Sequence, residues 1–251
     1  MRSYKNLCTE LYDLDKPHPP EDAFNFYMNH AKNSPGPVLE AMCGTGRFLI
    51  PMLEQGVEVE GLDASSHMLS ACKRKCAEKN LKPKLYHENL LNISLDKKYG
   101  LIFIPSGSFS LIADTYEAKL SLEALYKHLL PNGHLIFEVE TYHSCPTQLG
   151  YWQRDAKSHE RWDGAKIVLN TFSLYDKEKQ ILQTECLYEL VKDHKIIETE
   201  TEELQLRLYK EHEVEPWLKA IGFKQVKSMK GYSDELHDKN HDSMIYECSI
   251  E

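Results

Sequence analysis

The chain has 251 residues, enough to bury one core, or a core and a smaller subdomain, but not several independent domains. Its formal net charge of -9 argues against broad binding to a nucleic-acid backbone, which relies on a basic face. No apolar run approaches the roughly 20 residues of a membrane span, and the first residues lack the apolar core of a secretion signal. Seven cysteines without regular spacing are typical of reduced thiols. We therefore expect a cytoplasmic protein that binds neither nucleic acid nor a membrane.

The first 35 residues are polar and aromatic, and three prolines interrupt them at Pro17, Pro19 and Pro20. A helix is predicted for residues 21–31, where the prolines have ended. We expect residues 1–35 to form an N-terminal helical cap.

From residue 36 to about residue 141, apolar strand-like runs alternate with helical patterns. Alternation of this kind predicts right-handed crossovers and a parallel sheet. Strands are predicted near residues 38–40, 57–62, 84–87, 101–105 and 135–140, and helices near residues 47–55, 66–78 and 116–130.

Local signals mark the ends of these helices. Ser65 is a candidate cap for the second helix, and Asp114 with Glu117 forms a candidate capping box for the third. Gly56 and Gly133 are each expected to follow a helix. Pro51 is compatible with the first helix only if the first turn begins near Phe48.

The pattern changes after residue 144. Three long β-rich segments, at residues 166–175, 180–191 and 195–209, are separated by short polar turns, which favours an antiparallel meander. A helix near residues 211–220 and strands near 224–229 and 244–250 then complete the chain.

The most informative motif lies after the first predicted strand. That strand ends near Glu40, and Gly44 and Gly46 allow a tight turn before an apolar helix, so backbone N–H groups at the helix start can face a ligand. Asp63 ends the second predicted strand, at the place where the ribose of a bound nucleoside would lie. A dinucleotide-binding fingerprint would need a third glycine at position 49, which is Leu49. The turn therefore suits a nucleoside without a pyrophosphate.

This motif, together with the segment from Gly61 to Leu69, resembles the motif pair of class I S-adenosylmethionine-dependent methyltransferases. The resemblance implies an α/β fold: a doubly wound, Rossmann-like seven-stranded sheet with a small antiparallel β subdomain inserted after strand five. Residues 36–144 and 210–251 would form the methyltransferase domain. Residues 145–209 would form an insertion that covers the acceptor site, as in a subset of small-molecule methyltransferases.

The resemblance also implies a site for S-adenosylmethionine and its product S-adenosylhomocysteine. The glycines would let the backbone approach the methionine moiety, Asp63 would accept hydrogen bonds from the ribose, and Ala64 and Met68 would pack near the adenine. Asn89 stands where the family usually has an acid that accepts from the adenine amino group, and Met42 stands where glycine is more usual. The residues expected to contact the cofactor are Tyr12, Glu40, Ala41, Gly44, Gly46, Asp63, Ala64, Met68, Asn89, Leu90, Pro105 and Ser106.

Residues that follow the fifth predicted strand are candidates for catalysis. Strand alternation places Glu138 and Glu140 on one face, at the carboxyl end of the sheet where ligands bind. His143 is suited to accept a proton near neutral pH, and Tyr142 could orient the acceptor. A base is needed only if the acceptor carries a proton that must leave. We take Glu140, Tyr142 and His143 as the catalytic candidates.

Other residues admit a structural explanation. Cys72 and Cys76 are interpreted as ordinary helix residues, so no metal site is expected, and His237 and His241 as solvated loop histidines. The glutamates of residues 198–203 are most simply interpreted as the solvent-exposed face of a strand, although they could attract a cationic substrate. Aromatic and basic residues of the cap and insertion could close the pocket or merely pack the subdomain: Tyr12, Tyr27, Trp152, Arg161 and Trp162.

The sequence therefore predicts methyl transfer from S-adenosylmethionine to an oxygen or nitrogen atom of a small molecule. The main alternative is a module that binds S-adenosylmethionine or S-adenosylhomocysteine without turnover, because the cofactor motifs are clearer than the catalytic ones. A nicotinamide-dependent reductase is a third hypothesis, which the missing third glycine disfavours. The identity of the acceptor and the oligomeric state are not encoded in any motif.

Overall fold

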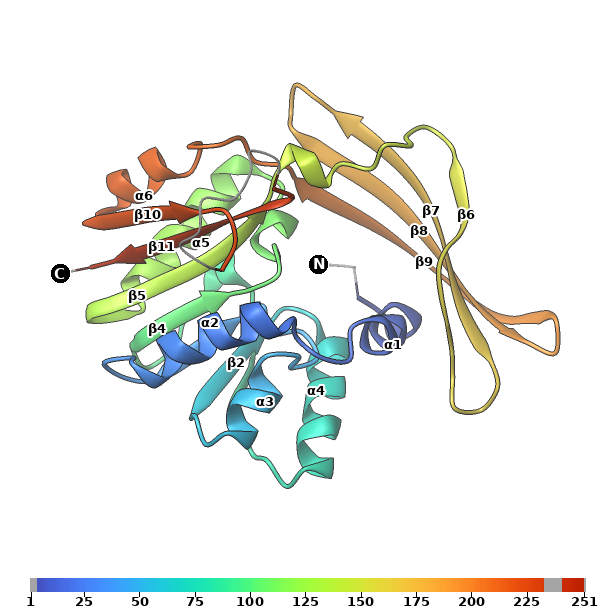
Figure 1. Ribbon diagram of the computed structural model, residues 1–251, viewed down its shortest axis with the longest axis horizontal. Helices are drawn as coiled ribbons and strands as arrows, with labels where there is room; N and C mark the ends of the chain where they lie inside the picture. Colours follow the sequence, from blue (N-terminus) through green and yellow to red (C-terminus); the bar gives the residue numbers. More distant parts are fainter. Residues whose placement is uncertain (1–3, 233–240, 251) are drawn as a thin grey trace.

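A computed structural model describes residues 4–232 and 241–250. It contains a seven-stranded sheet with the order β10-β11-β5-β4-β1-β2-β3 and a separate four-stranded sheet with the order β6-β7-β8-β9. Figure 1 shows the smaller sheet standing beside the larger one, with an N-terminal helix between them. The predicted α/β class, the doubly wound seven-stranded sheet and the inserted antiparallel sheet are all confirmed.

The large sheet is parallel except at one edge. Strand β1 pairs in parallel with β2 and β4, whereas β11 is antiparallel to both β5 and β10. The order reverses between β1 and β4, and ligands bind at such a switch point outside the carboxyl ends of the strands. The strands are β1 (Val38–Ala41), β2 (Val59–Asp63), β3 (Leu85–His87), β4 (Tyr99–Ile104), β5 (Leu129–Glu140), β10 (Gln225–Met229) and β11 (Ser243–Ser249).

The helices associated with the large sheet begin where their caps predict. The Ser65 hydroxyl accepts a hydrogen bond from the N–H of Met68 at 3.3 Å, and the Asp114 carboxylate accepts one from the N–H of Glu117 at 2.9 Å. The helices are α3 (Leu49–Glu54), α4 (Ser66–Glu78), α5 (Thr115–Lys127) and α6 (Glu215–Ile221), and the short 3-10 turns are η1 (Leu90–Asn92), η2 (Phe109–Leu111) and η3 (Tyr142–Ser144).

Two predictions about helix ends have different outcomes. Helix α3 has Phe48 as its N-cap, so Pro51 lies in the first turn, where its missing N–H costs nothing. Gly133, in contrast, does not follow a helix. Helix α5 ends at Lys127, and Gly133 lies inside β5, which is longer than expected and begins at Leu129.

The N-terminal cap contains two helices, α1 (Asn6–Asp15) and α2 (Glu21–Lys32), and only the second was predicted. Helix α2 buries Tyr27 and Met28 against the large sheet. Helix α1 packs instead on the smaller sheet. Its contact cluster comprises Leu7, Cys8, Leu11, Ala165, Ile167, Cys186, Tyr188 and Leu190.

Helix α1 lacks a local cap, because the side chain of its N-cap residue Lys5 makes no capping hydrogen bond. Carboxylates of the smaller sheet replace that cap. Glu202 accepts hydrogen bonds from the N–H groups of Tyr4 and Lys5 at 2.9 and 2.5 Å, and Glu200 accepts one from Cys8 at 3.1 Å. Interpreting all these glutamates as a solvated strand face was therefore wrong for Glu200 and Glu202, which stabilise the positive end of a helix.

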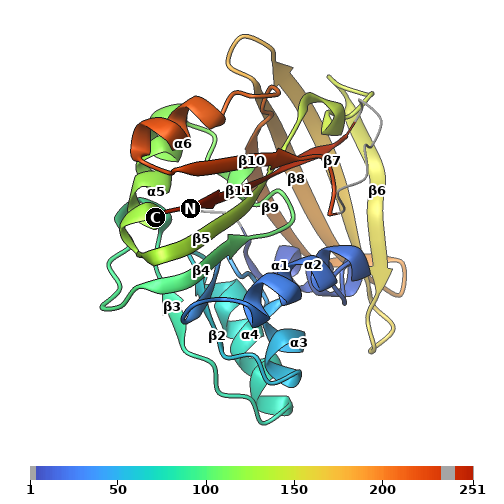
Figure 2. The ribbon, with the colours of Figure 1, turned by 60° about the vertical axis from the view of Figure 1, so that its left-hand side comes forward.

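The smaller sheet is antiparallel throughout and is made of β6 (Trp152–Glu160), β7 (Lys166–Asp176), β8 (Ile181–Lys192) and β9 (Lys195–Arg207). Three of these strands were predicted. Strand β6 was missed because its side chains are largely exposed and charged, so it carries no alternating apolar pattern. Figure 2 shows this sheet curving past α1 and α2.

Candidate functional site

A cavity lies at the carboxyl ends of β1 and β2. Its walls come from α1, the loops after β1, β2 and β3, and the η2 region. The lining residues that the sequence predicted are Tyr12, Gly44, Asp63, Ala64, Met68, Asn89 and Leu90. Those it did not predict as cofactor ligands are Tyr4, Met42, Leu62, Glu88, Ser108, Leu111 and Ile112.

Five predicted cofactor residues do not line this cavity: Glu40, Ala41, Gly46, Pro105 and Ser106. Several lining residues that the prediction lacked flank predicted ones, such as Leu62 before Asp63 and Glu88 before Asn89. Ser108 belongs to residues 104–109, which the resemblance places along the cofactor and methyl-transfer site. Tyr4, Leu111 and Ile112 carried no such signal, because their place at the cavity depends on the fold of the whole chain.

The two glycines of the turn serve different purposes. Both adopt left-handed backbone conformations, with φ of 55° at Gly44 and 82° at Gly46. A Cβ atom at Gly44 would meet only the Sδ atom of Met68, at 3.9 Å, so this glycine leaves open space at the cavity wall. A Cβ atom at Gly46 would lie 2.7 Å from Sγ of Cys72, so this glycine instead allows α4 to pack beneath the turn.

Asp63 ties the turn to the start of α4. Its carboxylate accepts hydrogen bonds from the N–H groups of Gly44 and Ser65, each at 2.8 Å. Burial raises the pKa of Asp63, and these backbone hydrogen bonds act against that shift. Because a carboxylate has about four acceptor positions, two backbone bonds leave capacity for further donors.

Asn89 uses part of its side chain locally. Its Oδ1 atom accepts a hydrogen bond from the N–H of Leu91 at 3.1 Å and so begins η1. The adjacent Leu90 is buried, as is Met68 across the cavity. Met68 and Leu90 therefore give the cavity apolar wall residues, and Asn89 adds an amide group to its lining.

Glu40 is a buried carboxyl group at the end of β1. The residue is 2% exposed, and among the described residues its Oε2 atom has no hydrogen-bond partner. Burial raises the pKa of Glu40 to about 8, while the positive charge of Arg47 lowers it. A buried carboxyl group with an unsatisfied oxygen is ready to accept a hydrogen bond from a ligand.

Glu140 approaches the loop that follows β4. A Cβ atom at Gly107 would lie 2.3 Å from its Oε1 atom, so only glycine leaves room for this carboxylate. Burial raises the pKa of Glu140 to about 6, and a hydrogen bond from Ser144 opposes the rise. Ser106 and Gly107 both have positive φ, 63° and 65°, and backbone strain of this kind often marks functional loops.

The neighbouring carboxylate, Glu138, already accepts hydrogen bonds from other side chains of the protein. It is buried, and the hydroxyl groups of Tyr27 and Tyr232 both donate to its Oε1 atom at 2.7 Å. Tyr27 therefore lies against the sheet and does not close the pocket. Glu140 remains the better placed carboxylate at the end of β5.

The other catalytic candidates lie at the surface. Tyr142 is 58% exposed and packs against Tyr175 with 5.6 Å between ring centroids, and His143 is also exposed. Their roles, like that of Glu140, stay predictions.

Two residues proposed to close the pocket do not do so. Trp162 is 93% exposed, and Arg161 forms ion pairs with Glu10 and Asp163 at 3.2 and 3.4 Å. His241 lies in a loop, as predicted, but it is half-buried and its Nε2 atom is buried, so its interpretation as a solvated histidine was wrong. His237 lies outside the described residues.

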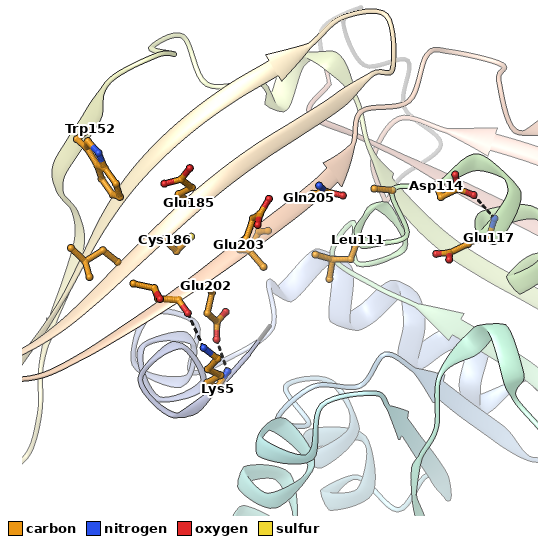
Figure 3. A pocket seen from close by; sticks show the side chains of 14 residues that line it. Lys5, Leu111, Asp114, Glu117, Trp152, Glu185, Cys186, Glu202, Glu203 and Gln205 are labelled. Carbon is orange, nitrogen blue, oxygen red and sulfur yellow. Dashed lines mark hydrogen bonds between the residues drawn. The ribbon is translucent and has the colours of Figure 1, made fainter. Parts of the chain in front are cut away.

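A second, larger groove of about 840 Å³ lies between the smaller sheet and the η2–α5 region (Figure 3). Carboxylates dominate it, and Lys5, whose N–H bonds Glu202, is its one cationic lining residue among those described. Leu111 lines both this groove and the first cavity, so the two are adjacent. The acidic lining residues are Asp114, Glu117, Glu185, Glu202 and Glu203.

The described part of the chain contains neither a candidate metal site nor a disulfide bond. No group of three or more histidine, cysteine or acidic side chains there is arranged to hold a metal ion. All seven cysteines are free thiols. No helix among the described residues is both long and apolar enough to cross a membrane.

Residues 38–133 match the family model described as a methyltransferase domain. Over these residues the chain is similar to methyltransferase domains. The matched residues hold the glycine turn, Asp63 and Asn89, so the resemblance found in the sequence is confirmed.

A curated relative, the dTDP-3-amino-3,6-dideoxy-alpha-D-glucopyranose N,N-dimethyltransferase of Streptomyces fradiae, is 27% identical over 142 residues, which cover 54% of this chain and 54% of the relative. The chain spans about half the length of the curated relatives it matches.

Solved structures extend the likeness over nearly the whole chain. An S-adenosylmethionine-dependent methyltransferase from Clostridium acetobutylicum ATCC 824 has a TM-score of 0.76 at 21% identity, covering 96% of both chains. The sugar N-methyltransferase KedS8 from Streptoalloteichus sp ATCC 53650 has a TM-score of 0.75 at 17% identity, covering 100% of this chain and 96% of its own. At these identities the likeness establishes the fold, including the inserted sheet.

Proposed function

We propose that the chain transfers the methyl group of S-adenosylmethionine to an amine nitrogen of a small molecule. One observation carries this proposal. The methyltransferase domain gathers Gly44, Asp63 and Asn89 around a single cavity at the switch point of its sheet. Three independent loops thus supply the groups expected for the methionine, ribose and adenine parts of one ligand.

The cofactor would lie along this cavity with its adenine between Met68 and Leu90 and its ribose near Asp63. Gly44 leaves room beside the turn, and Glu40 and Ser106 lie beyond it toward the methionine end. Adenine against apolar side chains, and hydroxyl groups beside a carboxylate, satisfy the chemistry of each part of the ligand.

Methyl transfer from a sulfonium is an in-line displacement: the acceptor nitrogen forms a bond to the methyl carbon as the carbon–sulfur bond breaks. The donor is already activated by its positive charge, so the protein mainly has to align the three atoms and exclude water. An acceptor that arrives as an ammonium has no free lone pair, so its nitrogen must lose a proton before it attacks. Glu140, with a pKa raised to about 6, is ionised near pH 7 and would accept that proton.

Two observations favour nitrogen over oxygen. The relative from Streptomyces fradiae is named as an N,N-dimethyltransferase. The groove beside the cavity is lined by five carboxylates, and such a field attracts ammonium groups and disfavours anionic acceptors. A small amine fits both observations.

The test is a pair of measurements. Calorimetry should show binding of S-adenosylhomocysteine and none of NAD, because the turn lacks a pyrophosphate position. A screen of amino sugars and alkyl amines, each paired with its hydroxyl analogue, should then give methylated product from amines alone, read by mass spectrometry. Tight cofactor binding without methylation of any acceptor would favour the non-catalytic module, and binding of NAD alone would favour a reductase.

A further inference from the structure

The acidic groove already contains one ammonium group, which belongs to the chain itself. Lys5 lines the groove, and its Nζ atom donates a hydrogen bond to the backbone carbonyl of Thr201 on β9 at 2.9 Å. Figure 3 shows Lys5 beneath β9, with the carboxylate of Glu202 directed toward it. The groove therefore offers a place where an ammonium group is held.

The ammonium group of Lys5 is weakly held. A lysine ammonium has three N–H donors, and among the described residues that of Lys5 donates only to Thr201. Within the same part of the chain it forms no ion pair, although five carboxylates line the groove. The hydrogen bond is also exposed to solvent, so breaking it costs little.

Helix α1 does not explain a lysine at this position. Lys5 is the N-cap residue, where Ser, Thr, Asn and Asp are favoured, and its side chain makes no capping hydrogen bond. A cation at the positive end of a helix is unfavourable. Glu202 holds the helix through the backbone N–H of Lys5, not through its side chain. The ammonium group can therefore leave Thr201 without releasing α1.

Lys5 lies at the border between the groove and the cofactor cavity. The preceding residue, Tyr4, lines the cavity, and Leu111 lines both spaces. An acceptor that moves from the groove toward the cofactor therefore meets Lys5. Two ammonium groups at this border would repel each other, so an acceptor amine and the side chain of Lys5 compete for the same place.

We propose that Lys5 is a specificity-determining residue whose ammonium group is exchanged for that of the acceptor amine. The inference rests on the proposed function, because only an amine acceptor brings a cation that replaces the one it displaces. The side chain of Lys5 then moves into solvent, and the carboxylates of the groove keep a counter-ion. A hydroxyl analogue brings no charge and leaves Lys5 in place, so the residue acts against neutral acceptors.

The first measurement is steady-state kinetics with an amine that the acceptor screen yields. Lys5→Met removes the competing cation and should lower the KM about 3- to 10-fold, the equivalent of one hydrogen bond, with kcat within twofold of wild type. Lys5→Arg keeps a cation and should retain the wild-type KM. Lys192→Met, which removes an equal charge from an exposed residue of β8 outside the groove, should leave the KM unchanged.

The second measurement does not depend on turnover. Titration calorimetry compares 1,4-diaminobutane with butane-1,4-diol in the presence of S-adenosylhomocysteine. Lys5→Met should bind the diamine about 3- to 10-fold more tightly than wild type does, and the diol equally. If Lys5→Met does not fold, as judged by circular dichroism, Lys5→Gln carries both measurements, because it removes the charge and keeps a donor for Thr201.

An unchanged KM in folded Lys5→Met would overturn the inference. A raised KM would also overturn it, because Lys5 would then help to hold the acceptor. An equal fall in Lys192→Met would reduce the effect to net charge. If no amine is methylated, the proposed function itself fails. Lys5 is then judged by the diamine titration alone, in which equal affinity of the two proteins, or binding to neither, overturns the inference.

Discussion

The two sheets of this protein bury their strands in opposite ways. In the large sheet, β1 and β4 are buried at every position, whereas β6 of the smaller sheet is exposed or half-buried along its length. The large sheet therefore holds polar groups such as Glu40 and Asp63 at the ends of rigid strands. The smaller sheet has one face on α1 and presents charged side chains to a groove. We infer that the first sheet governs cofactor binding and chemistry, and the second governs access of the acceptor.

The largest effect should come from Glu140, at the end of β5. Glu140→Gln removes the proton acceptor and should lower turnover by about 10²- to 10⁴-fold while leaving the affinity for S-adenosylhomocysteine within a few fold. Because the base must be ionised, wild-type turnover should rise with pH through about 6, and the variant should lose this rise. Steady-state rates of the wild type and the variant from pH 5 to 9 measure both the loss of turnover and its pH dependence.

His143 is the rival base and supplies the control. His143→Ala should change turnover little, since the side chain is exposed in η3, whereas the sequence alone predicts the same 10²- to 10⁴-fold loss for it. A large loss at His143 and none at Glu140 would reverse the assignment. No loss in either variant would leave alignment alone as the source of catalysis.

Asp63 should give the next largest effect, on binding instead of turnover. Asp63→Ala removes a charged acceptor for the ribose hydroxyls and should weaken cofactor binding by about 1.5–3 kcal/mol. Its bonds to Gly44 and Ser65 also order the turn, so Asp63→Asn, which keeps one acceptor oxygen, should lose less. Calorimetry on variants with wild-type circular dichroism measures this, and unchanged affinity in folded Asp63→Ala would show that the ribose lies elsewhere.

Glu40 should make cofactor binding depend on pH. With a pKa raised to about 8, its carboxyl group is protonated near pH 7, and an ammonium group beside it would lower that pKa and release a proton. Binding of S-adenosylhomocysteine at pH 7 should then release close to one proton, falling toward zero by pH 9, and the affinity should rise about tenfold over this interval. Calorimetry in buffers of different ionisation enthalpy measures the protons, and Glu40→Gln should abolish their release.

The fold and about half of the cavity lining were predictable because their signals are local. The caps at Ser65 and Asp114, and the motif around Gly44 and Asp63, each lie within a few residues of the structure they define. The features that the sequence did not predict depend on contacts between residues far apart in the chain. Helix α1 is capped by Glu202 from β9, almost two hundred residues away, and no sequence pattern near Lys5 records that contact.

Residues brought together only by the tertiary fold were also missed. Gly46 is predicted as a cofactor-binding glycine, and the sequence did not predict that its missing side chain also makes room for Cys72. Arg47 lies inside the recognised motif, but its contacts were not predicted, because its partners Ser106 and Tyr12 come from the loop after β4 and from helix α1. The groove along the smaller sheet was anticipated only in part. Residues 198–203 were noted as a possible attraction for a cationic substrate, whereas Asp114 was noted only as a helix cap and Glu185 was not noted.

The smallest effect is predicted for substitutions in this acidic groove. They test the inference that the smaller sheet governs access of the acceptor while the large sheet governs cofactor binding and chemistry. Glu185 and Glu203 face each other across β8 and β9, where like charges repel, so their presence suits a cationic acceptor better than it suits the sheet. Glu185→Gln or Glu203→Gln should each raise the KM of an amine acceptor about two- to fivefold, because exposed charges interact weakly. The rise should shrink in high salt, and kcat and cofactor affinity should not change.

Glu198→Gln, on the same strand but outside the groove, is the matched control. An equal KM change in this control would reduce the effect to net charge, and a change in kcat would show that the smaller sheet acts on the chemistry as well as on access.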